Sequence, residues 1–287
     1  PTIKGKKTNN EKFAGADATY TIECYIPVSG KGIQAATAHN LGQNFSKMFD
    51  IKILDSTTIA HYIHQFSCGI TTSSIGVMLM NHGDDKGAII PPMVADIQIV
   101  IIPIIFKNKT DEVLDKCQKL YDQLLENGYR VKLDNSDHNS GWKFNNWETL
   151  GVPLRIEIGP RDVQKDVITL CKRNDFKKIT VDDANILSEI NNTLKTIQQE
   201  LYDKVHDELY SHIKIPISPS EFEFDLNGKN LCLIKWCETN ECEEIIKEKC
   251  KAKSLCIPVG LNMCNSSEKC VICGENAVND VLFGRSY

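Results

Sequence analysis

Apolar and charged residues alternate over residues 154–158, in the order Leu-Arg-Ile-Glu-Ile, and this pattern predicts a β-strand. In an extended strand the three apolar side chains face a core, whereas Arg155 and Glu157 share the opposite, solvent-exposed face. The Gly-Pro pair that follows predicts the end of the strand, and the next two residues, Arg161 and Asp162, are expected at a turn.

Helical spacing is found on both sides of this strand. Apolar residues recur three and four positions apart over residues 111–127 and again over 182 to about 212, and each pattern predicts a helix with one buried face. The apolar run 97–106 predicts a fully buried strand. The other elements expected here are two strands and a short helix, at 129–134, 166–172 and 143–150. Strands that alternate with helices indicate an α/β layer fold.

The two ends of the chain predict mixed strands and helices. Strand-like segments lie at 19–28, 59–67 and 231–236, and helical segments at 41–49, 70–80 and 241–253. The helix at 70–80 is expected to be entered from a turn at Cys68 and Gly69, and the basic residues 4–7 to form an exposed loop. Loops and cysteines dominate the remainder of the last third.

Composition adds limits to this picture. The chain has 287 residues, of which 41 % are hydrophobic and 25 % charged, as in a soluble protein of two or three small domains. A net charge of -5 argues against a general nucleic-acid coat but is compatible with RNA binding through a local patch. The run 97–106 is too short to span a bilayer, and no signal peptide is visible, so we expect no membrane partner.

Cysteines are the most unusual feature of the composition. Eight of the twelve lie between Cys232 and Cys273. Since no secretory signal is visible, metal binding is favoured over disulfides. Four residues separate Cys237 from Cys242 and two separate Cys270 from Cys273, and two such pairs can supply four thiolates to zinc. The alternative is a set of free buried cysteines. Cys232 itself is expected to be a buried thiol in a strand.

The charged residues around the strand at 154–158 suggest a second kind of chemistry. Arg155, Glu157, Arg161 and Asp162 form a dense set of donors and acceptors that suits the edges of unpaired bases. The alternative is a solvated strand face with two local ion pairs, because exposed charge pairs are common and weak.

Several segments resemble one protein family. Residues 147–162 resemble the signature of the anticodon-binding domain of prolyl-tRNA synthetases of the archaeal and eukaryotic type, and Leu-Phe-Gly-Arg-Ser-Tyr at 282–287 is similar to that family's chain end. Residues 13–17 and 41–49, and His-Gly-Asp-Asp-Lys-Gly at 82–87, resemble its catalytic domain. The resemblance runs from the first residue to the last, in family order.

The resemblance implies an α/β and α+β multidomain protein. Residues 1–96 would be part of a class II antiparallel-sheet catalytic domain, with the region of its third motif. Residues 97–205 would be an α/β anticodon-binding domain, and 206–287 a small α+β zinc-type C-terminal domain. The structural Zn²⁺ ligands implied are Cys237, Cys242, Cys270 and Cys273. The terminal carboxylate of Tyr287 would approach the active-site side.

The resemblance also implies substrate-binding residues in the first segment. Gln34, Thr37 and Thr71 would bind ATP, and His39 and Gly69 would border the proline pocket. Without the family, these are ordinary polar and glycine positions of strands and loops.

Departures from the family pattern bear on activity. Ser73 stands where the third motif has an arginine that stacks on adenine, and Cys68 stands where the family has a tryptophan. A serine cannot replace the planar fork of an arginine. The first and second class II motifs are not found, and the chain is expected to begin after them. We therefore expect no adenylate formation by these 287 residues alone.

Five residues match family positions that read the anticodon: Glu148, Arg155, Arg161, Asp162 and Lys177. Proline anticodons share two guanines. Arginine can pair with guanine O6 and N7, and a carboxylate can accept from guanine N1–H and N2–H. A lone lysine such as Lys177 is otherwise a solvated side chain.

The function that the resemblance implies is that of a proline–tRNA ligase, here a fragment. The parent enzyme would activate proline with ATP and Mg²⁺, transfer it to tRNA-Pro, act in the cytoplasm and form a homodimer when intact. One alternative is a degenerate relative that binds tRNA without charging it, which Ser73 and Cys68 favour. A weaker alternative is a structural scaffold that uses its acidic surface.

Overall fold

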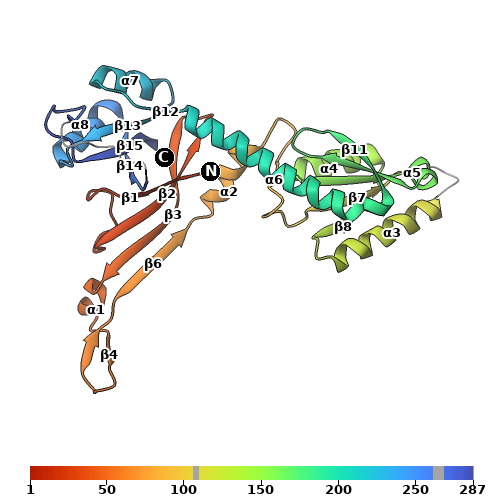
Figure 1. Ribbon diagram of the computed structural model, residues 1–287, viewed down its shortest axis with the longest axis horizontal. Helices are drawn as coiled ribbons and strands as arrows, with labels where there is room; N and C mark the ends of the chain where they lie inside the picture. Colours follow the sequence, from red (N-terminus) through yellow and green to blue (C-terminus); the bar gives the residue numbers. More distant parts are fainter. Residues whose placement is uncertain (106–109, 261–267, 287) are drawn as a thin grey trace. The chain divides into compact units, whose positions relative to one another are not determined.

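The computed structural model describes residues 1–105, 110–260 and 268–286 (Figure 1). Contacts within the chain divide it into two compact units, one formed by residues 1–77 with 206–287 and the other by residues 78–205. Residues from both ends of the chain therefore build one unit. The three segments expected from the sequence, 1–96, 97–205 and 206–287, stay a prediction about functional domains. Tyr287, whose terminal carboxylate was predicted to approach the active-site side, lies outside the described residues.

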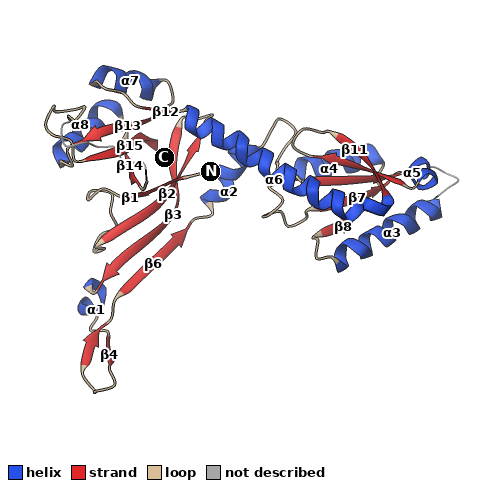
Figure 2. Ribbon diagram, viewed as in Figure 1, coloured by secondary structure: helices blue, strands red, loops and turns tan. Residues whose placement is uncertain are grey.

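The second unit is built on a sheet with the strand order β11-β10-β9-β7-β8 (Figure 2). Its strands are β7 (Ile99–Pro103), β8 (Val131–Leu133), β9 (Leu154–Ile158), β10 (Val167–Lys172) and β11 (Lys178–Asp182). Its helices are α3 (Thr110–Glu126), α4 (Ser140–Leu150), α5 (Pro160–Lys165) and α6 (Ile186–Ser211), the last of which continues into the first unit. The short helix η1 (Asp183–Asn185) precedes α6.

Strand β7 lies between β8 and β9 in this sheet. It pairs in parallel with β8 and with β9, so that Ile101 lies opposite Leu133 on one side and Ile156 on the other. β10 pairs antiparallel with β9 and with β11. The alternation of strands and helices predicted from the sequence is confirmed, and β7 is buried along its whole length, as its apolar run predicted.

Two apolar layers cover the two faces of this sheet. On one face, side chains of α3 and α6 such as Leu120 and Ile190 pack with Ile101 and Ile156 of the strands. On the other face, α4 supplies partly buried aromatic side chains, Phe144 and Trp147, which pack with Val100 and Ile102 of β7. The helices α3 and α4 therefore lie on opposite faces of the sheet.

The prediction that β9 exposes its charged face is wrong. All five residues of β9 are buried, and Arg155 and Glu157 are only 8 % and 9 % exposed. The two charges do share one face, but that face lies beneath α4, whose Phe144 ring is 4.1 Å from the Arg155 guanidinium. The alternation within a strand fixes which side chains share a face, and only the neighbouring helix decides whether that face meets solvent.

Two further local predictions differ from the structure. The segment after β9 is the short helix α5 instead of a turn, and the Asp162 carboxylate accepts a hydrogen bond of 2.8 Å from the Gly159 N–H at its start. β11 was not predicted, although Ile179 and Val181 alternate with polar residues along its five positions.

The first unit is built on a sheet to which both ends of the chain contribute. Its strand order is β12-β13-β15-β14-β1-β2-β3-β6, with a further parallel pairing of β15 and β3. The N-terminal strands are β1 (Ile3–Lys6), β2 (Ala18–Ile26), β3 (Lys31–Gly42) and β6 (Gln65–Ile70), and the C-terminal strands are β12 (Ile213–Lys214), β13 (Leu231–Trp236), β14 (Lys253–Pro258) and β15 (Asn279–Ser286). A separate hairpin consists of β4 (Lys52–Leu54) and β5 (Ala60–Tyr62).

The helices of this unit are α1 (Asn44–Met48), α2 (Ser73–His82), which continues into the second unit, α7 (Pro219–Asn227) and α8 (Asn240–Cys250). Phe222, Trp236 and Phe283 pack edge to face in the core of the C-terminal part. α7, β12, β14 and β15 were not predicted, since the last third was expected to consist mainly of loops.

Two predictions for the first unit are corrected. Residues 3–6 form β1 inside the sheet instead of an exposed loop, and the ammonium group of Lys7, which is 6 % exposed, bonds the Glu23 carboxylate at 2.7 Å. Cys68 and Gly69 lie within β6 and not at a turn, and the following helix begins at Ser73. No helix of the described residues is both long and apolar enough to cross a bilayer.

Candidate nucleic-acid interface and cysteine centre

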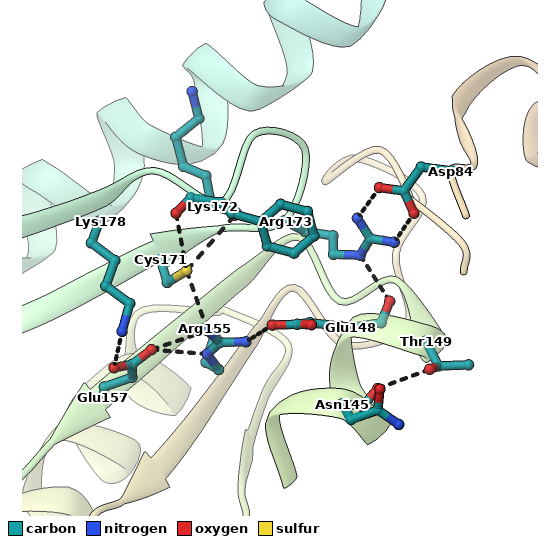
Figure 3. Close-up of polar contacts among 11 residues, drawn as sticks. Asp84, Asn145, Glu148, Thr149, Arg155, Glu157, Cys171, Lys172, Arg173 and Lys178 are labelled. Atoms are coloured by element: carbon teal, nitrogen blue, oxygen red, sulfur yellow. Dashed lines mark hydrogen bonds and ion pairs between the residues drawn. The ribbon is translucent and has the colours of Figure 1, made fainter. Parts of the chain in front are cut away.

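Arg155 is the centre of a polar cluster in the second unit (Figure 3). Its Nη1 donates to Glu148 Oε1 at 2.6 Å, its Nε to Glu157 Oε1 at 3.1 Å, and its Nη2 to the sulfur of Cys171 at 3.4 Å. Lys178 Nζ holds the other oxygen of Glu157 at 2.7 Å. Burial lowers the pKa of the Arg155 guanidinium, but the hydrogen bond to Glu148 and the nearby charges of Glu157 and Glu148 together outweigh it, so that the pKa is raised. The guanidinium is thus charged and committed to partners within the chain.

A second arginine, Arg173, forms a hydrogen bond with the backbone near the end of α4. Arg173 is 3 % exposed and forms a two-pronged ion pair with Asp84, at 2.8 and 2.7 Å, while its Nε donates to the carbonyl of Glu148 at 2.8 Å. The hydrogen bonds from Arg173 lower the pKa of Asp84 to about 2. Arg155 and Arg173 therefore hold the side chain and the backbone of Glu148 separately, and this residue is fixed in place (Figure 3).

The remaining predicted anticodon residues lie outside this cluster. Arg161 is exposed on α5, and Asp162 is half-buried. Lys177 is exposed in the turn between β10 and β11, where its backbone N–H donates to Asp175 at 2.9 Å. Glu148 retains a side-chain exposure of 18 %. The structure thus brings Glu148 and Arg155 together, whereas Arg161 and Lys177 offer freely accessible charges.

Sequence reasoning missed Arg173, Asp84 and Phe144 as parts of the cluster. Asp84 falls within the His-Gly-Asp segment that carried part of the family resemblance, but its partner is 89 positions away in the chain. The Lys172-Arg173 pair at the end of an otherwise apolar strand could have indicated a buried ion pair, because buried charged side chains are rarely without partners.

The four predicted cysteines converge in the first unit. Cys237 follows β13, Cys242 lies in the first turn of α8, and Cys270 and Cys273 lie in a turn that the bridge between Lys269 and Asn276 closes. All four sulfur atoms lie within 4.8 Å of one another. The distances from the Cys237 sulfur to those of Cys242 and Cys273 are 3.6 and 3.7 Å.

These distances fit a tetrahedral thiolate site. Bonds of about 2.3 Å from zinc to sulfur place the four sulfurs of a regular tetrahedron about 3.8 Å apart. Burial raises the pKa of the Cys237 thiol, but hydrogen bonds with Thr239, Cys242 and Cys270 together outweigh it, so that the pKa is lowered to about 7. Burial raises the pKa of Cys242 to about 12. A divalent cation would supply the positive charge that four converging thiolates require. Cys232 is fully buried in β13, as predicted, and burial raises the pKa of its thiol to about 12.

The residues matched to the proline pocket lie on neighbouring strands. Thr37 of β3 is paired with Gly69 of β6, and a Cβ on that glycine would lie 3.7 Å from the Thr37 hydroxyl. His39 bonds the hydroxyls of Thr19 and Thr37 through its two ring nitrogens, at 3.0 and 3.1 Å. Thr37 is thus the neighbour of Gly69 across the strand pair and the hydrogen-bond partner of His39.

The residues matched to the ATP site are less closely grouped. Thr37 and Gly69 border a cavity of about 610 Å³ whose other walls are largely apolar, and neither Gln34 nor Thr71 lines it among the described residues. Gln34 is exposed on β3. Thr71 is exposed after β6, and its hydroxyl bonds that of Ser73, the residue that stands in place of the family arginine.

Comparison with known proteins gives two matches to family models. Residues 98–193 match a model described as the anticodon binding domain, and residues 219–287 match one described as the C-terminal part of prolyl-tRNA synthetase.

Curated relatives match the chain over its whole length. It is 41 % identical over 288 residues to a proline–tRNA ligase of Ruminiclostridium cellulolyticum and 40 % identical over 314 residues to a putative proline–tRNA ligase of Saccharomyces cerevisiae. It is 41 % identical over 310 residues to a bifunctional glutamate/proline–tRNA ligase of Drosophila melanogaster. The alignments cover 59 %, 46 % and 18 % of these relatives. The chain therefore spans less than two thirds of the length of the curated relatives it matches.

Proposed function

The chain belongs to the prolyl-tRNA synthetase family, whose C-terminal part it matches, and we propose that its segment 97–205 binds the anticodon loop of tRNA-Pro. The observation that carries this proposal is the match of residues 98–193 to an anticodon-binding family, together with the fixed carboxylate at its centre. The residues proposed to act are Glu148, Arg155, Arg161, Asp162 and Lys177.

Their chemistry assigns them different tasks. Glu148, which Arg155 and Arg173 hold in place, can accept hydrogen bonds from N1–H and N2–H of a guanine. Arg155 is a positioning residue, because three hydrogen bonds already occupy its guanidinium. Arg161 is exposed and can pair with O6 and N7 of a guanine, with Asp162 beside it. Lys177 suits a phosphate contact.

Binding of tRNA-Pro by alanine variants tests these tasks. Arg161→Ala should weaken binding by about 1–3 kcal/mol and relax discrimination against altered guanines, whereas Lys177→Ala should weaken binding to all tRNAs and lower the salt dependence. Lys165→Ala, on the exposed end of α5, is the matched control. An equal loss for every tRNA with Arg161→Ala would reduce that residue to a phosphate contact.

We further propose that the intact protein is a proline–tRNA ligase, which uses ATP with Mg²⁺ to activate proline. The relatives' names support this, and Gln34, Thr37 and Thr71 are the proposed ATP residues, with His39 and Gly69 for proline. The 287 residues alone should give no proline-dependent exchange between ATP and pyrophosphate. Measurable exchange by this polypeptide would contradict that expectation.

A non-catalytic tRNA-binding relative is the second candidate. The observation that favours it is Ser73, whose hydroxyl bonds Thr71 where the family has an arginine. A hydroxyl cannot stack on adenine or neutralise phosphate charge. The reading frame upstream of residue 1 separates the two candidates, since an intact second class II motif would support the ligase.

The C-terminal segment is proposed to be a zinc-type domain. Cys237, Cys242, Cys270 and Cys273 would hold one Zn²⁺, and the role is structural, because four thiolates leave no open position for water. The convergence of the four sulfurs supports this. A cytoplasmic location and a homodimer of the intact protein complete the proposal, and sedimentation of the full-length protein tests the latter.

A further inference from the structure

A buried polar cluster joins the N-terminal strands of the first unit to its C-terminal part. Its six side chains are each no more than 6 % exposed and belong to Lys7, Thr8, Thr21, Glu23, Glu243 and Ser254. Thr8 and Ser254, whose hydroxyls share a hydrogen bond of 3.0 Å, are 246 positions apart in the chain. Because buried polar side chains cost free energy unless they are paired, the members of this cluster depend on one another for their positions.

One end of the cluster lies beside the cysteine centre. Glu243 follows Cys242 in the first turn of α8, and its carboxylate accepts hydrogen bonds from Thr8 at 3.2 Å and from Asn10 at 2.9 Å. The hydroxyl of Ser254 in β14 donates to the same carboxylate. Since Cys242 and Glu243 are consecutive residues of one helical turn, a shift of this turn moves both side chains.

The other end of the cluster reaches the strands that carry residues matched to substrate binding. The Lys7 ammonium group donates to Glu23 and to the backbone carbonyl of Leu255 in β14, both at 2.7 Å. Glu23 also accepts a hydrogen bond of 2.6 Å from the hydroxyl of Thr21. Thr21 borders the cavity of about 610 Å³ and is paired across the sheet with Thr37. Buried polar contacts therefore lead from the cysteine centre to the wall of that cavity.

We propose that Glu243 is a positioning residue, through which metal binding by the four cysteines fixes the segment 7–10 and, with it, β1 and β2. When the cysteines hold a metal, Cys242 fixes the first turn of α8, and the fixed turn presents the Glu243 carboxylate to Thr8 and Asn10. Coupling of this kind is reciprocal, so the contacts of Glu243 also strengthen metal binding. The cysteine centre thus orders the substrate strands as well as the C-terminal part of the chain.

This inference rests on the proposed Zn²⁺ site, and hydrogen exchange of the whole chain with and without Co²⁺ distinguishes the two. Binding is followed by the visible absorption of a tetrahedral thiolate site. In the parent chain, one equivalent of Co²⁺ should slow exchange of the amides of residues 3–12 roughly 5- to 150-fold, as for a typical coupling between two sites. In Glu243→Ala, Co²⁺ should have little effect on these amides. A merely structural role of Glu243 would instead speed exchange equally with and without metal.

Two further variants keep the test decisive if Glu243→Ala folds poorly. Glu243→Gln retains an oxygen that can accept from the hydroxyls of Thr8 and Ser254, so it should keep most of the metal-dependent protection. Thr8→Val breaks the contact from the N-terminal side, without a change in α8, and should lose that protection. Glu244→Ala, at an exposed neighbouring position of the same helix, is the matched control.

The reciprocal measurement is the affinity for Co²⁺ in competition with a chelator. Glu243→Ala and Thr8→Val should bind Co²⁺ roughly 5- to 150-fold more weakly than the parent, whereas Glu244→Ala should bind it equally well. Unchanged Co²⁺ affinity and unchanged protection of residues 3–12 in Thr8→Val would overturn the coupling and leave the Zn²⁺ site standing. A parent chain that gives no tetrahedral thiolate absorption with Co²⁺ would overturn both.

Discussion

Removal of the Arg155 side chain should lower the free energy of unfolding of the second unit. In Arg155→Ala the carboxylates of Glu148 and Glu157, which are 18 % and 11 % exposed, lose their shared partner. Breaking a buried ion pair by removing one member typically costs 3–5 kcal/mol. Since Lys178 still holds one oxygen of Glu157, we expect a loss of about 3 kcal/mol in the free energy of unfolding.

Urea denaturation followed by circular dichroism, with hydrogen exchange of the β9 amides, measures this loss. Lys178→Ala is the control, because its side chain is 53 % exposed and its loss should cost less than about 1 kcal/mol. Combining Arg155→Met with Glu148→Gln and Glu157→Gln should restore much of the stability, since no buried charge is left unpaired. An Arg155→Ala variant within about 0.5 kcal/mol of the parent would refute the buried cluster.

Three further predictions concern pH, metal and packing. Arg173 lowers the pKa of Asp84 to about 2, so the ion pair stabilises the fold fully above the ordinary pKa of 3.8 and is lost as the pH falls towards 2. Between about pH 4 and pH 2 the melting temperature should therefore fall more steeply in the parent than in Asp84→Asn. Cobalt(II) should bind once per chain with the visible absorption of a tetrahedral thiolate site, and Cys273→Ser should alter that spectrum whereas Cys68→Ser should not. Gly5→Ala should destabilise the first unit by about 1–3 kcal/mol in urea, because a Cβ there would lie 2.4 Å from a cysteine of β14, and an unchanged midpoint would contradict the close pairing of β1 and β14.

The sequence predicted the second unit well because its elements depend on local periodicity. The apolar spacing over 111–127 and the run 97–106 correspond to α3 and β7. Burial of Arg155 could not be predicted in this way, since α4, which covers it, is brought there by pairing between strands far apart in sequence.

The first unit was harder to predict for a related reason. β1 is held between β2 and β14, and the latter lies about 250 residues further along the chain. The partner that turns residues 3–6 into a strand is therefore invisible to local patterns. The cysteine centre was predictable because the spacing within each pair is local, although the approach of the two pairs depends on the fold.

We propose above that this chain reads the guanines of a proline anticodon. The most direct measurement is the affinity of the whole chain for tRNA-Pro and for two variants in which one or the other anticodon guanine is replaced by adenine. We expect each replacement to weaken binding roughly 5- to 100-fold, as loss of specific base contacts does, whereas a replacement in the acceptor stem should change binding little. Equal affinity for all of these RNAs would contradict it.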